Sequence, residues 1–281
     1  MELESRTPAE VANLLSNDVS LKKVNTSFGR LVILGVLAGA YIGFGAELST
    51  IVSHDLARFL GVGFARLVQG AVFSVGLMLV VIAGAELFTG NNLVMLSVLD
   101  GKTSVKKLLY NWVVVYIANL IGSLVLVVLM YWTELWNMNN NLVGAYALSV
   151  ANSKVNLSFL SAFARGILCN WLVCLAVWMA FASREVVGKI FAIFFPIMAF
   201  VASGFEHSVA NMYFIPMGIL LKDVPAVVSM AGIADLSKLS WYSFFVRNLI
   251  PVTLGNIVGG AGFVAGLYWL VYVNKGRRSK A

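Results

Sequence analysis

Four ionisable side chains lie inside apolar stretches of this 281-residue sequence: Glu47, Glu86, Glu206 and His207. Charged groups are costly in an apolar setting, so such residues usually mark a pathway or a buried pair. His207 is the one histidine at a predicted helix break, and an imidazole exchanges its proton near neutral pH. It is either a proton donor to a weak-acid anion or a neutral ring that hydrogen-bonds the carbonyls of the break.

Two of these carboxylates occupy matching positions in the sequence. The pattern Gly-x-Glu-x4-Asn occurs at 84–91 and again at 204–211, with Glu86 and Glu206 at its centre. This match indicates a shared scaffold role, such as accepting the free amides where each helix restarts. Bare carboxylates would repel an anion, so we expect both to point away from any anion path.

A cation and three apolar side chains complete the set of candidates. Lys154 lies in a predicted polar connection, 137–156, where it is a solvated loop charge or an attractor of anions at a pore mouth. Phe73, Leu77 and Phe200 lie on apolar stretches that lead into the breaks. They form a dry constriction or are ordinary packing residues.

The composition predicts that these residues are carried by membrane-spanning helices. The chain is 60% hydrophobic and 12% charged, with a mean hydropathy of +0.87. Most of its apolar stretches approach the roughly 20 residues that a spanning helix needs. They are 31–52, 67–81, 108–131, 157–181, 190–202 with 209–221, and 244–273. We predict an all-α integral membrane protein with six transmembrane helices, of which the second and fifth are interrupted.

A second repeated spacing supports an internal repeat. Asn111, Asn119 and Gly122 in the third span are spaced as Asn248, Asn256 and Gly259 are in the sixth. Short matches can arise by chance, but these fall on corresponding spans. Each half then holds three spans, and an odd number makes the second half enter the membrane from the opposite side. We therefore expect an inverted 3+3 repeat with the substrate site between the halves.

The charges predict the orientation and the divisions of the chain. Thirteen of the 20 Lys and Arg fall on the side of both termini, which the positive-inside rule assigns to the cytoplasm. This bias explains the net charge of +7 without a nucleic-acid partner. We expect an N-terminal segment with a short amphipathic helix (1–28), a channel domain (29–273) and a basic tail (274–281).

Four segments resemble the formate/nitrite transporter family. They are 83–90 (AGAELFTG), 170–178 (NWLVCLAVW), 200–208 (FVASGFEHS) and 248–256 (NLIPVTLGN). The resemblance covers nearly the whole chain. It implies a homopentamer of aquaporin-like protomers in a bacterial inner membrane, each with its own pore for a small monovalent anion.

The resemblance also assigns roles to residues. The family's central histidine matches His207, and its outer-vestibule lysine is similar in setting to Lys154. Its hydrophobic constrictions match Phe73, Leu77 and Phe200. Its gating loop matches Leu87, Phe88 and Thr89, and its pore asparagines match Asn170 and Asn256. It implies that His207 protonates a formate, nitrite or hydrosulfide anion. The segment 90–92 (GNN) is more polar than in formate channels, which favours the hydrosulfide branch.

Two other classes of function fit less well. A neutral-solute channel of the aquaporin type would carry an Asn-Pro-Ala tripeptide at each break, and neither break has one. An intramembrane enzyme could use Glu206 and His207 as acid and base, but no nucleophile motif or His-Glu-x-x-His spacing occurs. We therefore expect no catalytic site, no metal and no cofactor.

Overall fold

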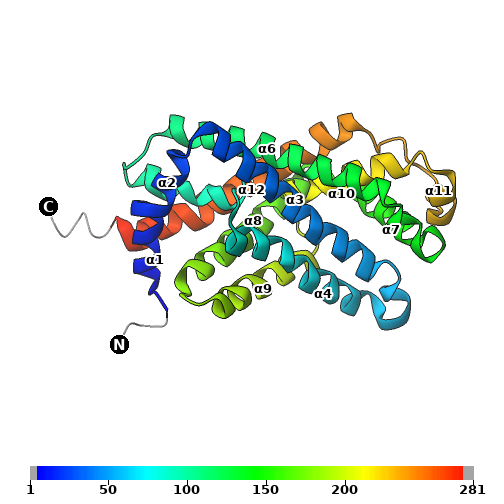
Figure 1. Cartoon of the computed structure of the whole chain (residues 1–281), viewed down its shortest axis with the longest axis horizontal. Coiled ribbons are helices and arrows are strands. Elements are labelled where there is room, and N and C mark those ends of the chain that lie inside the picture. Colours follow the sequence, from blue (N-terminus) through cyan, green and yellow to red (C-terminus); the bar gives the residue numbers. More distant parts are fainter. Residues whose placement is uncertain (1–4, 275–281) are drawn as a thin grey trace.

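The computed structural model describes residues 5–274, and Figure 1 shows that this part of the chain is a bundle of helices. The longer helices are α3 (Phe28–Ser53), α4 (Leu56–Met78), α6 (Val105–Trp132), α7 (Met138–Val155), α8 (Phe159–Ala182), α9 (Val186–Ala202) and α10 (Ser208–Leu221). The shorter ones are α1 (Pro8–Leu14), α2 (Ser20–Val24), α5 (Met95–Leu99), α11 (Pro225–Ala231) and α12 (Ile250–Ile257). Segments of 3-10 or π helix join them: η1 (Leu15–Val19), η2 (Leu79–Gly84), η3 (Gly90–Val94), η4 (Leu135–Asn137), η5 (Ser243–Leu249), η6 (Val258–Gly266) and η7 (Trp269–Val273).

Within the described part of the chain, five helices are long and apolar enough to cross a membrane. They are Phe28–Ser53, Leu56–Gly84, Val105–Trp132, Phe159–Ala182 and Ser243–Val273. The predicted fifth span is present as two pieces, α9 and α10, with a non-helical break between them. The other predicted break follows η2. Both interruptions therefore fall where the sequence indicated them.

Small residues bring the helices together in the same way in both halves. In the first half, Gly122 of α6 lies against the backbone of Val36 on α3. In the second half, Gly259 of η6 lies against the backbone of Ile167 on α8. Such close approach is how helices associate where lipid removes the hydrophobic driving force. The bundle therefore contains two similar packing units.

The helix α10 lies at the centre of the bundle. All of its residues except Leu220 are buried, and it contacts α3, α6 and α7. A helix that is apolar around its whole circumference is stable only inside a protein or a membrane. The second break thus leads directly into the core, and its side chains have little freedom to move.

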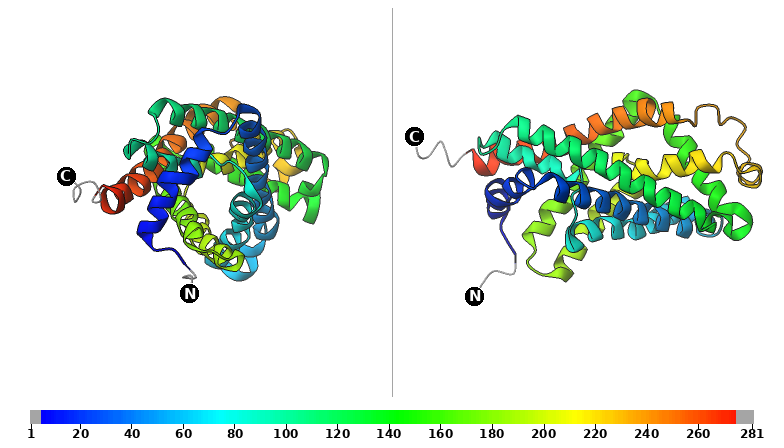
Figure 2. Two further views of the ribbon diagram at one scale, coloured as in Figure 1. Left: turned by 60° about the vertical axis from the view of Figure 1, so that its left-hand side comes forward. Right: turned by 45° about the horizontal axis from the view of Figure 1, so that its top comes forward.

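The N-terminal segment packs on the channel itself. A capping box of Thr7 and Glu10 begins α1, and its hydrogen bonds from the Thr7 backbone and side chain hold the pKa of the Glu10 carboxyl below its ordinary value. The apolar face, with Val11 and Leu15, is fully buried against the protein. In Figure 1 and in the right-hand view of Figure 2 these helices lie beside the red segment η7, which α1 contacts. The predicted basic tail lies outside the described residues, apart from Asn274.

The predicted polar connection 137–156 is a helix instead of a loop. Residues of α7 pack against α10 and α11, and Leu148 and Ala151 are fully buried. The polar composition misled the prediction, because the asparagines gather at the start of α7, where Asn139, Asn140 and Asn141 have positive φ. The regular helix that follows them buries small and apolar residues. Lys154, in the last turn of α7, is consequently held by helix packing.

We predict that Gly39→Ala destabilises the protein by about 1–3 kcal/mol, the usual cost of overpacking. A Cβ at Gly39 of α3 would collide with the backbone oxygen of Asn119 on α6. Thermal unfolding of the detergent-solubilised protein, followed by tryptophan fluorescence, measures the effect. Gly29→Ala in the same helix is the matched control, since a Cβ there has no atom within 4 Å. Equal melting temperatures for the two variants would contradict the prediction.

Candidate functional site

The first break is held by a four-residue polar cluster. The Glu86 carboxylate accepts hydrogen bonds from the Lys23 ammonium (2.8 Å) and the Asn91 side-chain amide (2.7 Å). Asn91 also donates to Oδ1 of Asn111 (2.9 Å), and Asn111 donates to the backbone oxygen of Lys23 (3.3 Å). The cluster joins α2, the break, η3 and α6.

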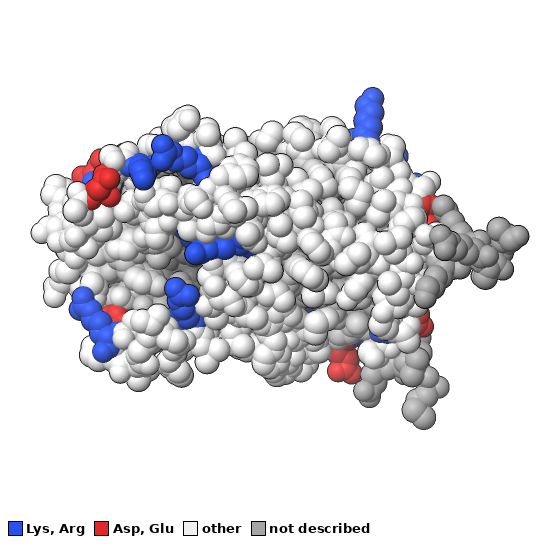
Figure 3. Space-filling view, turned by 180° about the vertical axis from the view of Figure 1, so that it is seen from behind, with Lys and Arg blue, Asp and Glu red and all other residues white. Residues whose placement is uncertain are grey.

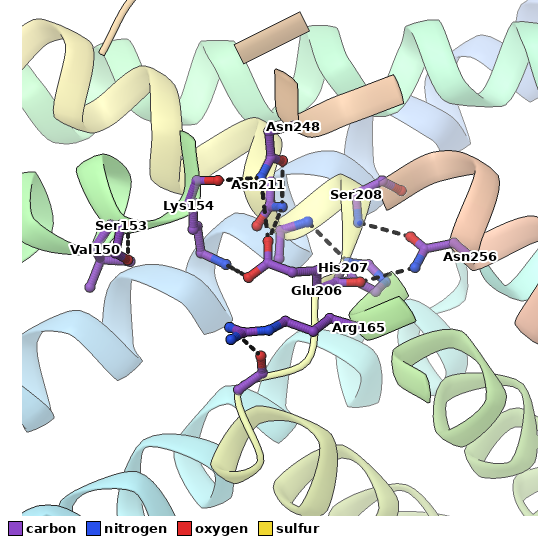
Figure 4. Close-up of polar contacts among 12 residues, drawn as sticks. Val150, Ser153, Lys154, Arg165, Glu206, His207, Ser208, Asn211, Asn248 and Asn256 are labelled. Atoms are coloured by element: carbon purple, nitrogen blue, oxygen red, sulfur yellow. Dashed lines mark hydrogen bonds and ion pairs between the residues drawn. The ribbon is translucent and has the colours of Figure 1, made fainter. Parts of the chain in front are cut away.

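The second break repeats this cluster with different residues (Figure 4). Glu206 accepts from the Lys154 ammonium (2.9 Å) and from the Asn211 amide (2.7 Å). Asn211 donates to Oδ1 of Asn248 (2.7 Å), and Asn248 donates to the backbone oxygen of Lys154 (3.1 Å). Both carboxylates thus have a lysine and an asparagine amide as partners, and not the free backbone amides that the sequence suggested.

Sequence reasoning missed Lys23, although a signal for it was present. The stretch 23–28 (KVNTSF) and the stretch 154–159 (KVNLSF) differ at one position. Each lies directly before the first long helix of its half, α3 or α8. This match pairs Lys23 with Lys154 and would have predicted the Lys23–Glu86 ion pair from the Lys154–Glu206 pair.

Two asparagines satisfy the backbone of the breaks. Oδ1 of Asn119 accepts from the Phe88 N–H (3.0 Å), and its amide donates to the backbone oxygens of Gly35 (2.8 Å) and Glu86 (2.9 Å). An asparagine amide has two donor hydrogens and one carbonyl oxygen, so Asn119 uses every group it has. It replaces the helical hydrogen bonds that the first break has lost.

Asn256 does the same for the second break. Its Oδ1 accepts from the Ser208 N–H (2.9 Å), and its amide donates to the backbone oxygens of Gly166 (2.8 Å) and Glu206 (3.0 Å). Asn170 donates to the backbone oxygens of Asn256 (2.7 Å) and Thr89 (3.2 Å), so it connects the first break to α12, whose Asn256 holds the second break. Asn170 and Asn256 were predicted to line a pore. Both are fully buried, and neither is among the residues that line the cavities described next.

Two cavities lead toward the breaks from opposite ends of the molecule. The outer one, of about 500 Å³, is lined by Lys154, Glu206 and His207 and by residues of the α3–α4 turn. The inner one, of about 450 Å³, is lined by Lys23, Glu86, Lys189 and the first break. In Figure 1, α2 and the α3–α4 turn lie at opposite ends of the long axis.

A narrow void of about 10 Å³ lies between the cavities. It shares Phe73, Phe200 and His207 with the outer cavity, and Leu77 and Leu87 with the inner one. The Phe73 and Phe200 rings meet edge to face at 5.7 Å. The three side chains predicted to form a constriction therefore line a small void that shares residues with both cavities. The remaining residues of the void are Ile42, Val173 and Ile197.

His207 is the only polar residue that lines this void, and both of its ring nitrogens have partners. Nδ1 accepts a hydrogen bond from the Ala210 N–H (3.0 Å), as the N-cap of α10. Nε2 lies 2.9 Å from the hydroxyl of Thr89. Because Nδ1 acts as an acceptor, the neutral ring carries its proton on Nε2 and donates it to Thr89. The imidazole thus both caps the restarted helix and faces the first break.

The predicted gating loop, Leu87 to Thr89, is buried and well connected. Phe88 packs edge to face on Tyr116 at 4.9 Å. The backbone oxygen of Thr89 accepts from the Asn170 amide (3.2 Å) and from the Cys174 thiol (3.4 Å). Leu87 alone of the three lines the void. Leu87 and His207 thus both contribute to the wall of the small void.

Lys154 lies at the floor of the outer cavity, and its charge is already matched. Its side chain is 14% exposed, with its ammonium on Glu206 and 5.3 Å from the Phe214 ring centre. Three arginines also line this cavity: Arg58, Arg66 and Arg165. Figure 3 shows blue side chains gathered around a hollow at the left-hand end of the molecule. Among residues 5–274, no group of His, Cys, Asp and Glu side chains could hold a metal ion.

The chain is similar to known transporters and channels over most of its length. The model of the formate/nitrite transporter family matches residues 10–270. A probable formate transporter of Methanothermobacter thermautotrophicus is 45% identical, with 96% of this chain and 98% of the relative covered. The formate channel FocA of Escherichia coli K12 is 40% identical, with 86% of each chain covered. A solved pentameric formate channel with formate bound superimposes with a TM-score of 0.79 at 42% identity, covering 88% of this chain and 98% of that one.

We predict that Asn256→Ala lowers the free energy of unfolding by about 1–3 kcal/mol for each buried group left without a partner. The variant removes the acceptor of Ser208 and the donor to the Gly166 and Glu206 oxygens. Thermal unfolding in detergent tests this, with the exposed Asn156→Ala as the control. If both variants unfold together, Asn256 does not hold the break.

Proposed function

The chain belongs to the formate/nitrite transporter family, and we propose that it is a channel for small monovalent anions, with formate as the first candidate. One observation carries the proposal. Two cavities from opposite ends share lining residues with a void of about 10 Å³ whose wall is apolar except for His207. The named formate channels among its relatives support formate as the substrate.

The constriction opposes the passage of a bare charge. An anion that enters it loses its water, and Phe73, Leu77 and Phe200 offer no compensating hydrogen bond. A small weak acid avoids this cost when it crosses as its neutral form. The proposal is therefore that the anion gains a proton beside His207 and loses it again in the cavity beyond.

The proposed proton donor is the His207 ring in its charged form. Nδ1 can take up a proton only when it releases the Ala210 amide, because that nitrogen is the acceptor in the resting state. The charged ring is then held in an apolar wall without its backbone partner, which favours transfer of the proton to a nearby anion. Afterwards Nδ1 can accept from Ala210 again.

The loop from Leu87 to Thr89 is proposed as the movable side of the constriction. It is anchored at Phe88 by Asn119 and at Thr89 by His207, so opening has to displace Leu87 relative to these anchors. This would couple the gate to the ring that handles the proton.

The polarity of segment 90–92 does not help to choose between formate and hydrosulfide. Asn91 donates to Glu86 and Asn111 within the first break cluster, and the Asn92 amide donates to the backbone oxygen of Phe88. Both amides thus serve the scaffold. We keep hydrosulfide and nitrite as further candidate anions, to be compared with formate in liposome uptake at two pH values.

We propose that the protein is a homopentamer in a bacterial cytoplasmic membrane, with both termini in the cytoplasm. The pentameric formate channel that it resembles supports the assembly. The positive-inside bias of the sequence supports the orientation. Apolar side chains on α6 are exposed in the isolated protomer, among them Val113 (56%), Ile117 (52%) and Val125 (51%). Lipid or neighbouring protomers would cover them.

Of the two rival functions, the intramembrane enzyme is excluded by the relatives, and the neutral-solute channel can be tested by experiment. The relatives that the chain matches are transporters and channels, so it is not an enzyme. A neutral-solute channel would swell liposomes in water or glycerol gradients at any pH. The proposed anion channel should show no such swelling, and swelling without formate uptake would favour the rival.

We predict that His207→Asn lowers formate uptake into proteoliposomes by about 100-fold, the usual contribution of a general acid, and removes its pH dependence. His54→Asn removes the other histidine, which bonds to Ile51 and Asn139 instead of facing the constriction, and should keep the wild-type pH dependence. An unchanged rate and pH profile in His207→Asn would exclude the proton-transfer role.

Lys154→Gln should raise the formate concentration that gives half-maximal uptake, because the Glu206 carboxylate then faces the anion without its counter-charge. The double variant with Glu206→Gln removes both charges and should restore part of the affinity. Uptake measured over a range of formate concentrations separates the cases. If the double variant is as poor as Lys154→Gln, then Lys154 attracts the anion by itself, as the sequence alone suggested.

A further inference from the structure

The outer cavity has a surplus of positive charge that the path for a monovalent anion does not require. Four cationic side chains and two carboxylates line it, which leaves an excess of two positive charges. The cationic side chains are Arg58, Arg66, Lys154 and Arg165, and the carboxylates are Asp55 and Glu206. One formate would neutralise only half of that excess.

Two of the arginines converge on the second break. Nη1 of Arg165 donates to the backbone oxygen of Gly204 at 3.5 Å. Nη1 of Arg66 lies 3.6 Å from the point where a Cβ of Gly204 would be. Figure 4 shows Arg165 reaching across the cavity to this oxygen, below Glu206. The two guanidinium groups therefore meet at one residue, although like charges repel each other.

No carboxylate in residues 5–274 forms an ion pair with these arginines. Glu206 is the acidic residue nearest to Gly204 along the chain, and its carboxylate already binds Lys154 and Asn211. Arg58 and Arg66 likewise belong to none of the ion pairs in this part of the protein. Arg58, Arg66 and Arg165 are exposed, so their guanidinium groups are accessible to a ligand from the cavity. Guanidinium groups bind carboxylates and other oxyanions through paired hydrogen bonds.

We propose that Arg66 and Arg165, with Arg58 at the rim, form a binding site for a small dianion, such as a short dicarboxylate or sulfate. Two negative charges balance the excess in the cavity. The site lies on the outer side of Phe73 and Phe200, which line both the cavity and the constriction. A dianion bound here occupies the route of the monovalent anion.

Such a dianion should block the channel without crossing it. The void beyond is about 10 Å³ and contains one titratable side chain, His207. A dicarboxylate would need two protons to become neutral, and a singly protonated one still carries a charge into the apolar constriction. The effect on transport depends on the proposed function, whereas binding of the dianion does not.

Calorimetry with the purified protein in detergent tests the site directly, with malonate and sulfate as probes. We expect both to bind to the wild type, and Arg66→Gln and Arg165→Gln each to weaken binding by about tenfold or more, the value of a lost charge-assisted hydrogen bond. Arg247→Gln is the matched control, because Arg247 is exposed, as Arg66 and Arg165 are, but does not line the cavity. Monomethyl malonate, a monoanion of similar shape, should bind more weakly.

Transport in proteoliposomes supplies the second measurement. Malonate should raise the half-saturating formate concentration without changing the maximal rate, and this effect should disappear in Arg66→Gln. Binding that survives both substitutions, or equal binding of monomethyl malonate, would overturn the site. Uptake of labelled malonate would overturn the block. If the wild-type protein binds malonate but does not transport formate, the result counts against the proposed function and not against the dianion site.

Discussion

A helix that breaks at membrane depth exposes backbone amides and carbonyls that lipid cannot satisfy, and in this protein one asparagine at each break takes their place. Asn119 and Asn256 each use both amide hydrogens and the carbonyl oxygen on the backbone of a break and of a neighbouring helix. Without these bonds, the chain would not leave its helical path at the two positions that bring Leu87 and His207 to the void. The geometry of the constriction therefore depends on two buried side chains that do not line it.

The two halves share a scaffold and differ in the residue that it presents. Leu87 follows Glu86 as His207 follows Glu206, and the next residue in each half donates its amide to the matching asparagine. The repeat thus places an apolar side chain and an imidazole in the wall of one void. The framework is shared, but only the second half has an ionisable side chain at this position, because Leu87 corresponds to His207.

Charge in the outer cavity is divided between paired and unpaired groups. Lys154 is matched by Glu206, just as Lys23 is matched by Glu86 on the inner side. The ion pairs fasten α2 and α7 to the breaks, while the arginines supply the net positive charge of the cavity. In the low dielectric of a partly buried site, separating such a pair is costly, so the lysines contribute to the architecture as well as to the field.

The amino-acid sequence by itself determined the membrane setting, the family and both breaks. These follow from local properties: hydropathy over a span, glycines that interrupt a helix, and short repeated patterns. It could not determine that 138–155 is assigned as helix, that Asn170 and Asn256 bond to backbone oxygens, or that Lys154 has a partner in Glu206. Those outcomes were decided by the tertiary structure, because the partner of a buried polar group comes from a distant part of the chain, and its position is known only once the helices have packed.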